Sequence, residues 1–335
     1  MTAFRLIEME AGGRAVEVDA YLRWAASRRF TVVRVLAMAK HLFELPPDKG
    51  AAALDAFLAR AARHGLHVEV VALADTASYE MDMAAHVRRI GATCARHPNA
   101  LLEIANEPYH ATQRAEVHDA KYLERLRAEV PPGVPVALGA GDNPAVLTGG
   151  DYVTVHFPRS IAREGWGWVA ALGDARRMLK TSGKPVIDDE PLGAGQRFEP
   201  GRRDADPEKF RAAALAGRLT GIGSTFHYEG GLQARLANGR ELECLRAWSE
   251  AWTIIPGDGP LEPFDAGPSA PVRAVKGTPV LAVMATRATS AWVLLVGAGA
   301  AASIDVAPGW TVASRQDWPN SRLYMLAKVT SRTPR

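Results

Sequence analysis

The feature that most constrains the fold is a regular alternation of short apolar runs with segments of helical spacing, from residue 2 to about residue 255. The apolar runs are rich in Val, Ile and Leu, which is typical of strands buried on both faces of a parallel sheet. We expect eight strands, at 2–7, 30–37, 66–73, 100–107, 134–139, 151–156, 184–190 and 222–227. Eight βα units in about 250 residues predict an α/β fold, a (β/α)8 TIM barrel whose first strand lies at the very N-terminus.

Helices are expected between these strands. Their apolar residues recur on one stripe, and proline or glycine marks several of their ends, as Pro47 and Gly65 do. We expect helices at 16–29, 47–64, 83–97, 116–129, 169–180, 207–219 and 241–252.

The texture of the sequence changes after residue 255. A Gly/Pro-rich connection is followed by short alternating runs such as 280–284 and 292–296, which predict an antiparallel β module of about six strands. We therefore expect a catalytic barrel at 1–255, and a linker with a small C-terminal β module at 256–335. The module lacks an obvious row of exposed aromatic residues, so a structural cap is favoured over a sugar-binding role.

Composition excludes several classes of function. The net charge of +3 on 335 residues comes from scattered arginines, so no nucleic-acid partner is expected. The sequence contains no run of 18 apolar residues, so no membrane span is expected. Cys94 and Cys244 form no metal-ligand or redox spacing, and no metal or other cofactor is expected. No signal peptide is visible, and the chain begins inside its first expected strand, which leaves its compartment open.

Two of the expected strands end in glutamate. The run 100–108, Ala-Leu-Leu-Glu-Ile-Ala-Asn-Glu-Pro, delivers Glu107 where the strand ends, and the run 184–191 delivers Glu190 in the same way. The two glutamates are 83 residues apart, or three βα units. Strands three apart in an eight-stranded ring face each other across the mouth of the barrel, so we expect these carboxylates to face each other.

The run ending in Asn106-Glu107-Pro108 resembles the fourth strand of the retaining glycoside hydrolases of clan A, in particular the family-five cellulase-like enzymes. The run ending in Glu190 is similar to the seventh strand of the same clan. The resemblance implies hydrolysis of O-glycosidic, β-type bonds in an oligo- or polysaccharide by double displacement. Glu107 is then the acid/base and Glu190 the nucleophile, with their carboxyl groups about 5–5.5 Å apart.

The resemblance also implies residues that contact the substrate. Arg34, in the middle of an apolar strand, is expected to pair with the nucleophile, and Asn106 to bind the sugar 2-hydroxyl. The chain departs from the family pattern at Pro158, where a tyrosine is usual, and in the eighth strand, where His227 lies and a tryptophan is usual. Candidate substrate-binding residues are Arg34, Asn106, Tyr109, His156, Trp166, Trp168 and His227, with Phe43 and Tyr79 as weaker candidates.

Two other functions stay open. The missing tyrosine and tryptophan favour a sugar-binding barrel without catalysis, whereas the two glutamates and Arg34 favour an enzyme. A divalent-metal-dependent barrel enzyme is the third alternative, because 188–190 is Asp-Asp-Glu. Alternate residues of a strand point to opposite faces, so only Asp188 and Glu190 are expected to share the barrel interior.

Overall fold

The computed structural model describes residues 1–37, 46–140, 147–157, 159, 165–195, 203–257, 259–297 and 302–329. The chain forms two compact units, each built from separate segments of the sequence. The first contains 1–156, 181–195 and 225–241, and the second contains 157–180, 196–224 and 242–335. The units therefore do not follow a single cut at residue 255, and the predicted division into barrel and module stays a prediction.

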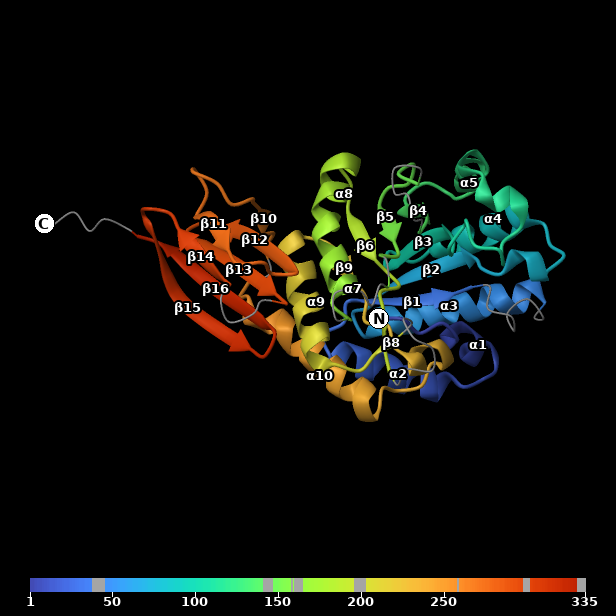
Figure 1. Cartoon of the computed structure of the whole chain (residues 1–335). Helices are drawn as coiled ribbons and strands as arrows, with labels where there is room; N and C mark the ends of the chain where they lie inside the picture. The colour runs from blue at the N-terminus through green and yellow to red at the C-terminus, as the bar shows by residue number, and fades with distance from the viewer. Residues whose placement is uncertain are drawn as a thin grey trace, which may run out of the picture. The chain divides into compact units, whose positions relative to one another are not determined.

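Parallel strands form the centre of the first unit. Four of them pair in chain order, β1 (Val32–Leu36), β2 (His67–Leu73), β3 (Ala100–Ala105) and β4 (Val136–Gly139). Two more, β5 (Val153–Val155) and β6 (Val186–Asp188), pair in parallel with each other. Figure 1 shows β1, β2 and β3 side by side with α3 and α4 beside them. Nearly every residue of these strands is buried, as the apolar runs predict.

Further backbone hydrogen bonds link these strands to their neighbours. Asp151 N donates to Val136 O over 2.6 Å, which joins the start of the β5 segment to β4. After β6, Thr225 N donates to Asp188 O over 2.9 Å. Thr2 N donates to Phe226 O over 3.2 Å. The segments at 2 and 225–226 are thus hydrogen-bonded to each other and to the neighbouring strands.

The first expected strand is much shorter than predicted. Thr2 makes an isolated parallel bridge to Arg34, and helix α1 (Leu6–Ala11) follows within four residues. Leu6 and Met9 are both buried, and their spacing of three places them on one face of a helix. Residues 6 and 7, which were expected to complete the strand, therefore begin a helix, because the helix buries its apolar face.

Helices surround the strands of the first unit. They are α2 (Ala15–Ser27), α3 (Pro47–Arg63), α4 (Met83–Cys94) and α5 (Ala120–Arg127), with single 3-10 turns at Thr76–Ser78, Ala115–His118 and Glu229–Gln233. The starts of these helices have local causes. Pro47 takes the first position of α3, while the carboxylates of Asp82 and Asp119 accept backbone N–H groups at the starts of α4 and α5. The apolar faces of α3, α4 and α5 pack on β2, β3 and β4.

The second unit combines helices with antiparallel strands. Its helical segments are α7 (Gly167–Ala171), a 3-10 turn at Leu172–Asp174, most of α8 (Ala175–Ser182) and α9 (Pro207–Thr220), whereas α10 (Gly239–Ile254) begins in the first unit and continues in the second. Short strands lie at β7 (Gly193–Ala194, first unit), β8 (Arg203–Asp204) and β9 (Gly223–Ser224).

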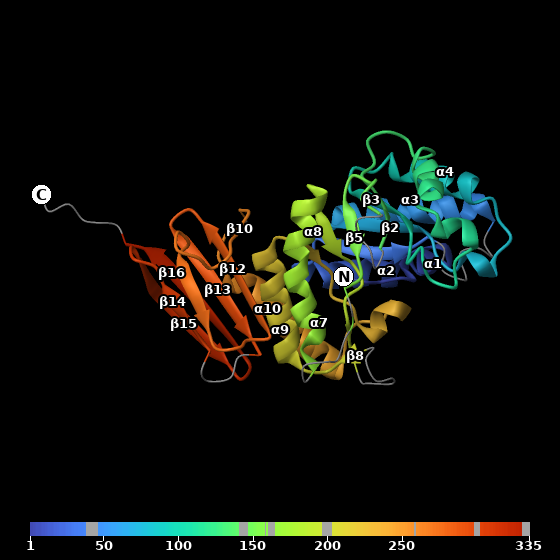
Figure 2. The same cartoon turned by 45° about the horizontal axis from the view of Figure 1, so that its top comes forward.

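The antiparallel strands lie where the C-terminal β module was expected. They are β10 (Glu262–Pro263), β11 (Val272–Lys276), β12 (Leu281–Arg287), β13 (Ser290–Val296), β14 (Ser303–Val306), β15 (Trp310–Trp318) and β16 (Ser321–Lys328). Five of them form one sheet in the order β10-β12-β13-β16-β15, and β11 pairs with β14 (Figure 2). Val272, Val293, Leu295, Tyr324 and Leu326 belong to the buried core of these strands.

Among the residues that the structure describes, no helix is both long enough and apolar enough to cross a bilayer.

Candidate active site

The guanidinium of Arg34 is the centre of the candidate site. Arg34 lies in β1 and is completely buried. Its Nη1 is 3.1 Å from Glu190 Oε2, and its Nη2 donates to Asn106 Oδ1 over 2.8 Å. The predicted contact between Arg34 and the other site residues is therefore present. A guanidinium presents five donors in a fixed fork, which suits it to join several acceptors from different strands.

Three further carboxylates surround the same guanidinium. Glu103 of β3 accepts from Nη2 over 2.9 Å, Asp189 Oδ2 lies 2.8 Å from Nε, and Glu69 Oε2 of β2 lies 3.9 Å from Nε. All three carboxylates are fully buried. The register pairs Arg34 with Glu69 across β1 and β2, so the acidic residue is the neighbour of the cation along the sheet.

Hydrogen bonds hold Glu103 and Glu69 in place. Glu103 Oε1 accepts from Ala140 N over 3.0 Å and from Thr154 Oγ1 over 3.2 Å. Glu69 Oε1 accepts from the hydroxyl of Tyr152 over 3.0 Å. Glu69 and Glu103 are not among the predicted site residues, although a polar residue inside an apolar strand is the same signal that identified Arg34.

Asn106 and Glu107 follow directly after β3. Glu107 has a φ of 40°, in the left-handed region that residues other than glycine seldom adopt. Asn106 N donates to Leu73 O over 2.8 Å, and the side-chain amide of Gln113 donates to Asn106 O. These bonds fix the backbone of the turn that carries Glu107, and backbone outliers of this kind cluster at functional sites.

His156, just after β5, connects the two glutamates. Its Nδ1 is 2.9 Å from Glu107 Oε1, while its Nε2 is 3.9 Å from Glu190 Oε2 and 3.2 Å from Asp189 Oδ1. The separation of Nε2 and Asp189 is that of an ion pair, but the two groups are not aligned as in a good hydrogen bond. One buried imidazole thus contacts the acids that follow β3 and β6.

The expectation for the Asp-Asp-Glu segment was wrong in one respect. Asp189 and Glu190, rather than Asp188 and Glu190, both approach Arg34. The strand β6 ends at Asp188, so the alternation of side chains along a strand no longer applies to the two residues that follow. The hydroxyl of Thr225 donates to Asp189 O over 2.7 Å and helps to fix this bend.

The charges of the buried groups adjust to one another. Burial, with Asp189 nearby, raises the pKa of Glu103 well above its usual range and that of Glu69 to about 7. Burial would also raise the pKa of Asp189, but Arg34 and His156 hold it below its usual value. Burial alone lowers the pKa of His156, yet Asp189 and Glu107 raise it to about 10. The surroundings therefore favour the charged form of Asp189, which lies between two cations, and disfavour the charged form of Glu103.

The carboxylates of Glu69, Glu103 and Asp189 are also close enough to share one cation, because one oxygen of each lies within 4.8 Å of the others. The guanidinium of Arg34 already contacts two of them directly and lies near the third. The structure therefore gives this acidic cluster an internal counter-ion, and that accounts for it without a metal.

The remaining candidates lie in different surroundings. His227 is buried in the first unit, with Nδ1 3.0 Å from Thr2 Oγ1 and its ring 6.2 Å from that of Phe4. The ring of Phe4 also lies 5.6 Å from the guanidinium of Arg34, so Phe4 belongs to the site although sequence analysis did not single it out. Tyr109 follows Glu107 by two residues and is 41% exposed.

The two tryptophans predicted to contact substrate are buried in the second unit. Trp168 packs on Phe210 of α9 at 5.3 Å, and the ammonium of Lys209 lies 5.7 Å from the ring of Trp166. A buried ring presents little open face to a sugar, so these surroundings favour packing roles for both. Pro158 and Phe43 lie outside the described residues.

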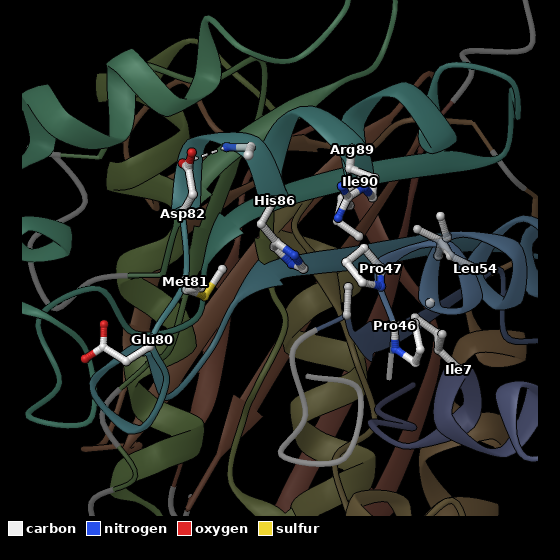
Figure 3. A pocket seen from close by; sticks show the side chains of 14 residues that line it. Ile7, Pro46, Pro47, Leu54, Glu80, Met81, Asp82, His86, Arg89 and Ile90 are labelled. Atoms are coloured by element: carbon white, nitrogen blue, oxygen red, sulfur yellow. Dashed lines mark hydrogen bonds between the residues drawn. The ribbon is translucent and has the colours of Figure 1, made fainter. Parts of the chain in front are cut away.

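A separate pocket of about 300 Å³ opens in the first unit between the starts of α3 and α4 (Figure 3). Ile7, Leu54 and Ile90 supply apolar wall, and His86 is one of its polar residues. The pKa of His86 is lowered to about 4 by burial, so its ring is neutral. None of the predicted catalytic or substrate-binding residues lines this pocket, which separates it from the cluster around Arg34.

Solved structures with similar folds are glycoside hydrolases. A candidate glycoside hydrolase from Bacteroides vulgatus ATCC 8482 is matched over 98% of this chain and 78% of its own, with a TM-score of 0.64 and 14% identity. A GH5_18 protein from Bifidobacterium longum subsp. infantis is matched over 72% and 74%, with a TM-score of 0.55 and 16% identity. The GH5_18 protein of Streptomyces cattleya is matched over 73% of this chain and 76% of its own, with a TM-score of 0.52 and 16% identity.

The chain has the fold of the family 5 glycoside hydrolases. These neighbours imply a TIM barrel, in agreement with the parallel strands of the first unit, and the antiparallel sheet is separate from it. No protein-family model matches the sequence, and no curated protein is significantly similar to it. At sequence identities of 14% and 16%, these similarities support a shared fold but not a shared activity, so the chemistry depends on the residues of this chain.

Proposed function

We propose that this protein is a retaining glycoside hydrolase that cleaves β-glycosidic bonds in an oligo- or polysaccharide. Glu107 is the acid/base and Glu190 the nucleophile. The observation that carries the proposal is that one buried histidine contacts both glutamates, while Arg34 contacts both Glu190 and Asn106. Two carboxylates that follow β3 and β6 thus belong to one polar cluster, which supports a double displacement with the carboxyl groups about 5–5.5 Å apart.

Each contact suits a step of that reaction. The positive charge of Arg34 favours the ionised form of Glu190, which attacks the anomeric carbon as Glu107 gives a proton to the leaving oxygen. Water then hydrolyses the glycosyl-enzyme while Glu107 takes the proton back. Glu190 is the nucleophile throughout this reaction, while Glu107 acts as the acid in the first step and as the base in the second.

The contact with Arg34 also orients Asn106. Because Oδ1 accepts from the guanidinium over 2.8 Å, the NH₂ group of the amide is left to donate elsewhere. A donor at this position suits the sugar 2-hydroxyl, and a hydrogen bond to that group strengthens as positive charge develops on the sugar ring.

The proposal extends to the architecture. The backbone bonds at Thr2, Val136 and Asp188 continue the parallel pairing beyond the two sheets, and we propose that they complete an eight-stranded (β/α)8 barrel. Active sites of such barrels lie at the carboxyl ends of the strands, where Asn106, Glu107, His156 and Glu190 are found.

The substrate class follows from the site and from the neighbours. Two structures of the GH5_18 protein of Streptomyces cattleya contain GlcNAc and Manb1-4GlcNAc, so a protein of this fold binds a small β-linked sugar. For this chain we propose a β-linked oligosaccharide, with Tyr109 at the exposed rim and His227 near the sugar in place of the usual tryptophan. A sugar-binding barrel without catalysis is the second candidate, and Pro158 in place of the usual tyrosine is the observation that favours it.

Turnover of a panel of nitrophenyl β-glycosides tests the proposal, with and without a chelator. We expect activity that the chelator leaves unchanged. Glu190→Ala should lose several powers of ten in rate, and azide should restore part of it by taking the place of the carboxylate. Glu107→Ala should still release a burst of phenol from an activated aryl glycoside, because that leaving group needs no proton.

Glu124→Ala, an exposed glutamate of α5, is the matched control and should keep the rate of the unmodified protein. Analysis of the product by NMR should show retained configuration at the anomeric carbon. Silence with every glycoside alongside measurable sugar binding would favour the binding barrel, and an inverted product would exclude the double displacement.

A further inference from the structure

Asp189 is a buried charge that the proposed reaction does not yet use. It directly precedes Glu190, is fully buried, and contacts two cations, with Oδ2 2.8 Å from Arg34 Nε and Oδ1 3.2 Å from His156 Nε2. A carboxylate in this position costs free energy unless its charge is compensated. Its place between the two cations therefore points to a task in the site.

The ring of His156 is held between two acids on opposite sides. Nδ1 lies 2.9 Å from Glu107 Oε1, and Nε2 faces Asp189. With a proton on Nε2 toward Asp189, the other nitrogen can either hold a proton for Glu107 or accept one from it. The side chain of His156 is only 4% exposed, so bulk water does not compete at either nitrogen.

We propose that Asp189 is a positioning residue that fixes the ring of His156 and makes this histidine the proton store of Glu107. The proposal rests on the assignment of Glu107 as the acid/base. It adds that the catalytic proton is shared between Glu107 and His156, and that the charge of Asp189 keeps it there.

The proton transfers balance in both half-reactions. In the first, the Nδ1–H bond of His156 breaks as an O–H bond forms on Glu107. Glu107 passes a proton to the leaving oxygen as the bond from that oxygen to the anomeric carbon breaks and the bond to Glu190 forms. In the second, water attacks the anomeric carbon, its proton goes to Glu107 and on to Nδ1, and the bond to Glu190 breaks.

The other charges near His156 cannot replace Asp189 in this task. Glu190 is farther from Nε2, at 3.9 Å, and loses its charge when it bonds to the sugar. Glu103 lies against Arg34, and burial raises its pKa and so disfavours its negative charge, while Arg34 repels a charged ring. Glu107 is the group that exchanges the proton. Asp189 is therefore the constant negative charge facing the ring, and its attraction contributes most to the raised pKa of His156.

Asp189→Asn keeps the size of the side chain and removes the charge. We expect the alkaline limb of kcat/KM for a glycoside with a poor leaving group to move down by one pH unit or more, which is about a tenfold loss above that limb. The rate with a dinitrophenyl glycoside, which needs no proton, should fall less than threefold. Asp204→Asn is the matched control, because it removes a buried carboxylate that is paired with Lys209 in the second unit. The alkaline limb of kcat/KM for this control variant should stay where it is in the unmodified protein.

The proposal would be overturned if the alkaline limb of kcat/KM did not move in Asp189→Asn, or if the rate fell equally with both leaving groups at every pH. Either result would mean that Asp189 supports Arg34 and Glu190, or the fold, instead of His156. Imidazole ¹⁵N NMR of the unmodified full chain gives a second test that needs neither activity nor the variant. With the signal assigned from His156→Gln, both ring nitrogens should be protonated at pH 8, and a neutral ring would refute the proposal. If no glycoside is hydrolysed while the ring is charged, the proposed function fails and the effect of Asp189 on the ring stands.

Discussion

Replacement of Arg34 by methionine tests how the buried charges support one another. Methionine has a similar volume and no charge, so the substitution removes the counter-ion and leaves the packing nearly filled. Arg34 contacts Glu103 at 2.9 Å, Asp189 at 2.8 Å and Glu190 at 3.1 Å. Removal of one partner from a buried ion pair costs about 3–5 kcal/mol, because the other charge is left uncompensated. We expect Arg34→Met to lower the free energy of unfolding by about this amount at neutral pH.

The loss should depend on pH. In the unmodified protein the pKa of Asp189 is below its usual value, so its stabilising contribution is present above its unfolded pKa and is lost as the pH falls. Without Arg34, burial raises the pKa of the same carboxyl above its unfolded value. A raised pKa reverses the sign, and stability is lost as the pH rises. The deficit of the variant should therefore be larger at pH 8 than at pH 5.

Urea denaturation of both proteins at the two pH values measures this deficit. Arg88→Met is the matched control, since Arg88 pairs with Glu129 on the surface of the first unit and its removal should cost less than about 1 kcal/mol. A deficit for Arg34→Met that is as small as that of the control, or that is equal at both pH values, would refute the account of Arg34 as the counter-ion of the cluster.

Three further predictions concern single residues. Glu69→Gln should gain stability relative to the unmodified protein between pH 5 and pH 8, because the stabilising contribution of a carboxyl whose pKa is raised to about 7 is lost over that range; denaturation at both pH values measures it, and a constant difference would contradict it. Tyr109→Ala should raise KM several-fold at unchanged kcat if its exposed ring stacks on the sugar, and an unchanged KM would remove it from the site. Gly139→Ala should lower the free energy of unfolding by about 1–3 kcal/mol or more, since φ is +142° and the added Cβ would lie 2.2 Å from Ala105 O. Gly133→Ala, with φ +94° and open space around the added Cβ, isolates the backbone part of this cost. Equal shifts of the melting temperature for the two variants would show that the contact with Ala105 is harmless.

Several features could be predicted because their causes are local. Buried parallel strands need runs of apolar, β-branched residues, and helices need an apolar stripe with stops, so the strands β1 to β6 and the helices α2 to α5 fall near their expected ranges. Arg34 could be identified because a charge inside such a run requires a buried partner. The same logic identifies Glu69 and Glu103 once it is applied to every strand.

Other features depend on contacts between residues distant in the sequence. The N-terminal strand gave way to α1 because Leu6 and Met9 are buried on one face, and that face exists only when the rest of the unit is folded. The two compact units are assembled from interleaved segments, which no single boundary in the sequence can describe. The burial of Trp166 beside Lys209 of α9 is likewise a contact between distant segments, and the prediction that this ring meets a sugar stays a prediction.

The periodicity of apolar residues records which stretches of backbone are buried, so it is enough to predict the alternation of strands and helices and the positions of Glu107 and Glu190 just after two strands. The tertiary structure decided which charges meet. Asp189 instead of Asp188 approaches Arg34 because β6 ends at Asp188, two residues before the predicted end of this strand, and beyond the end of a strand the direction of a side chain is set by the bend of the backbone. His156 contacts both glutamates because three strands bring their ends together, and that proximity is a property of the folded chain.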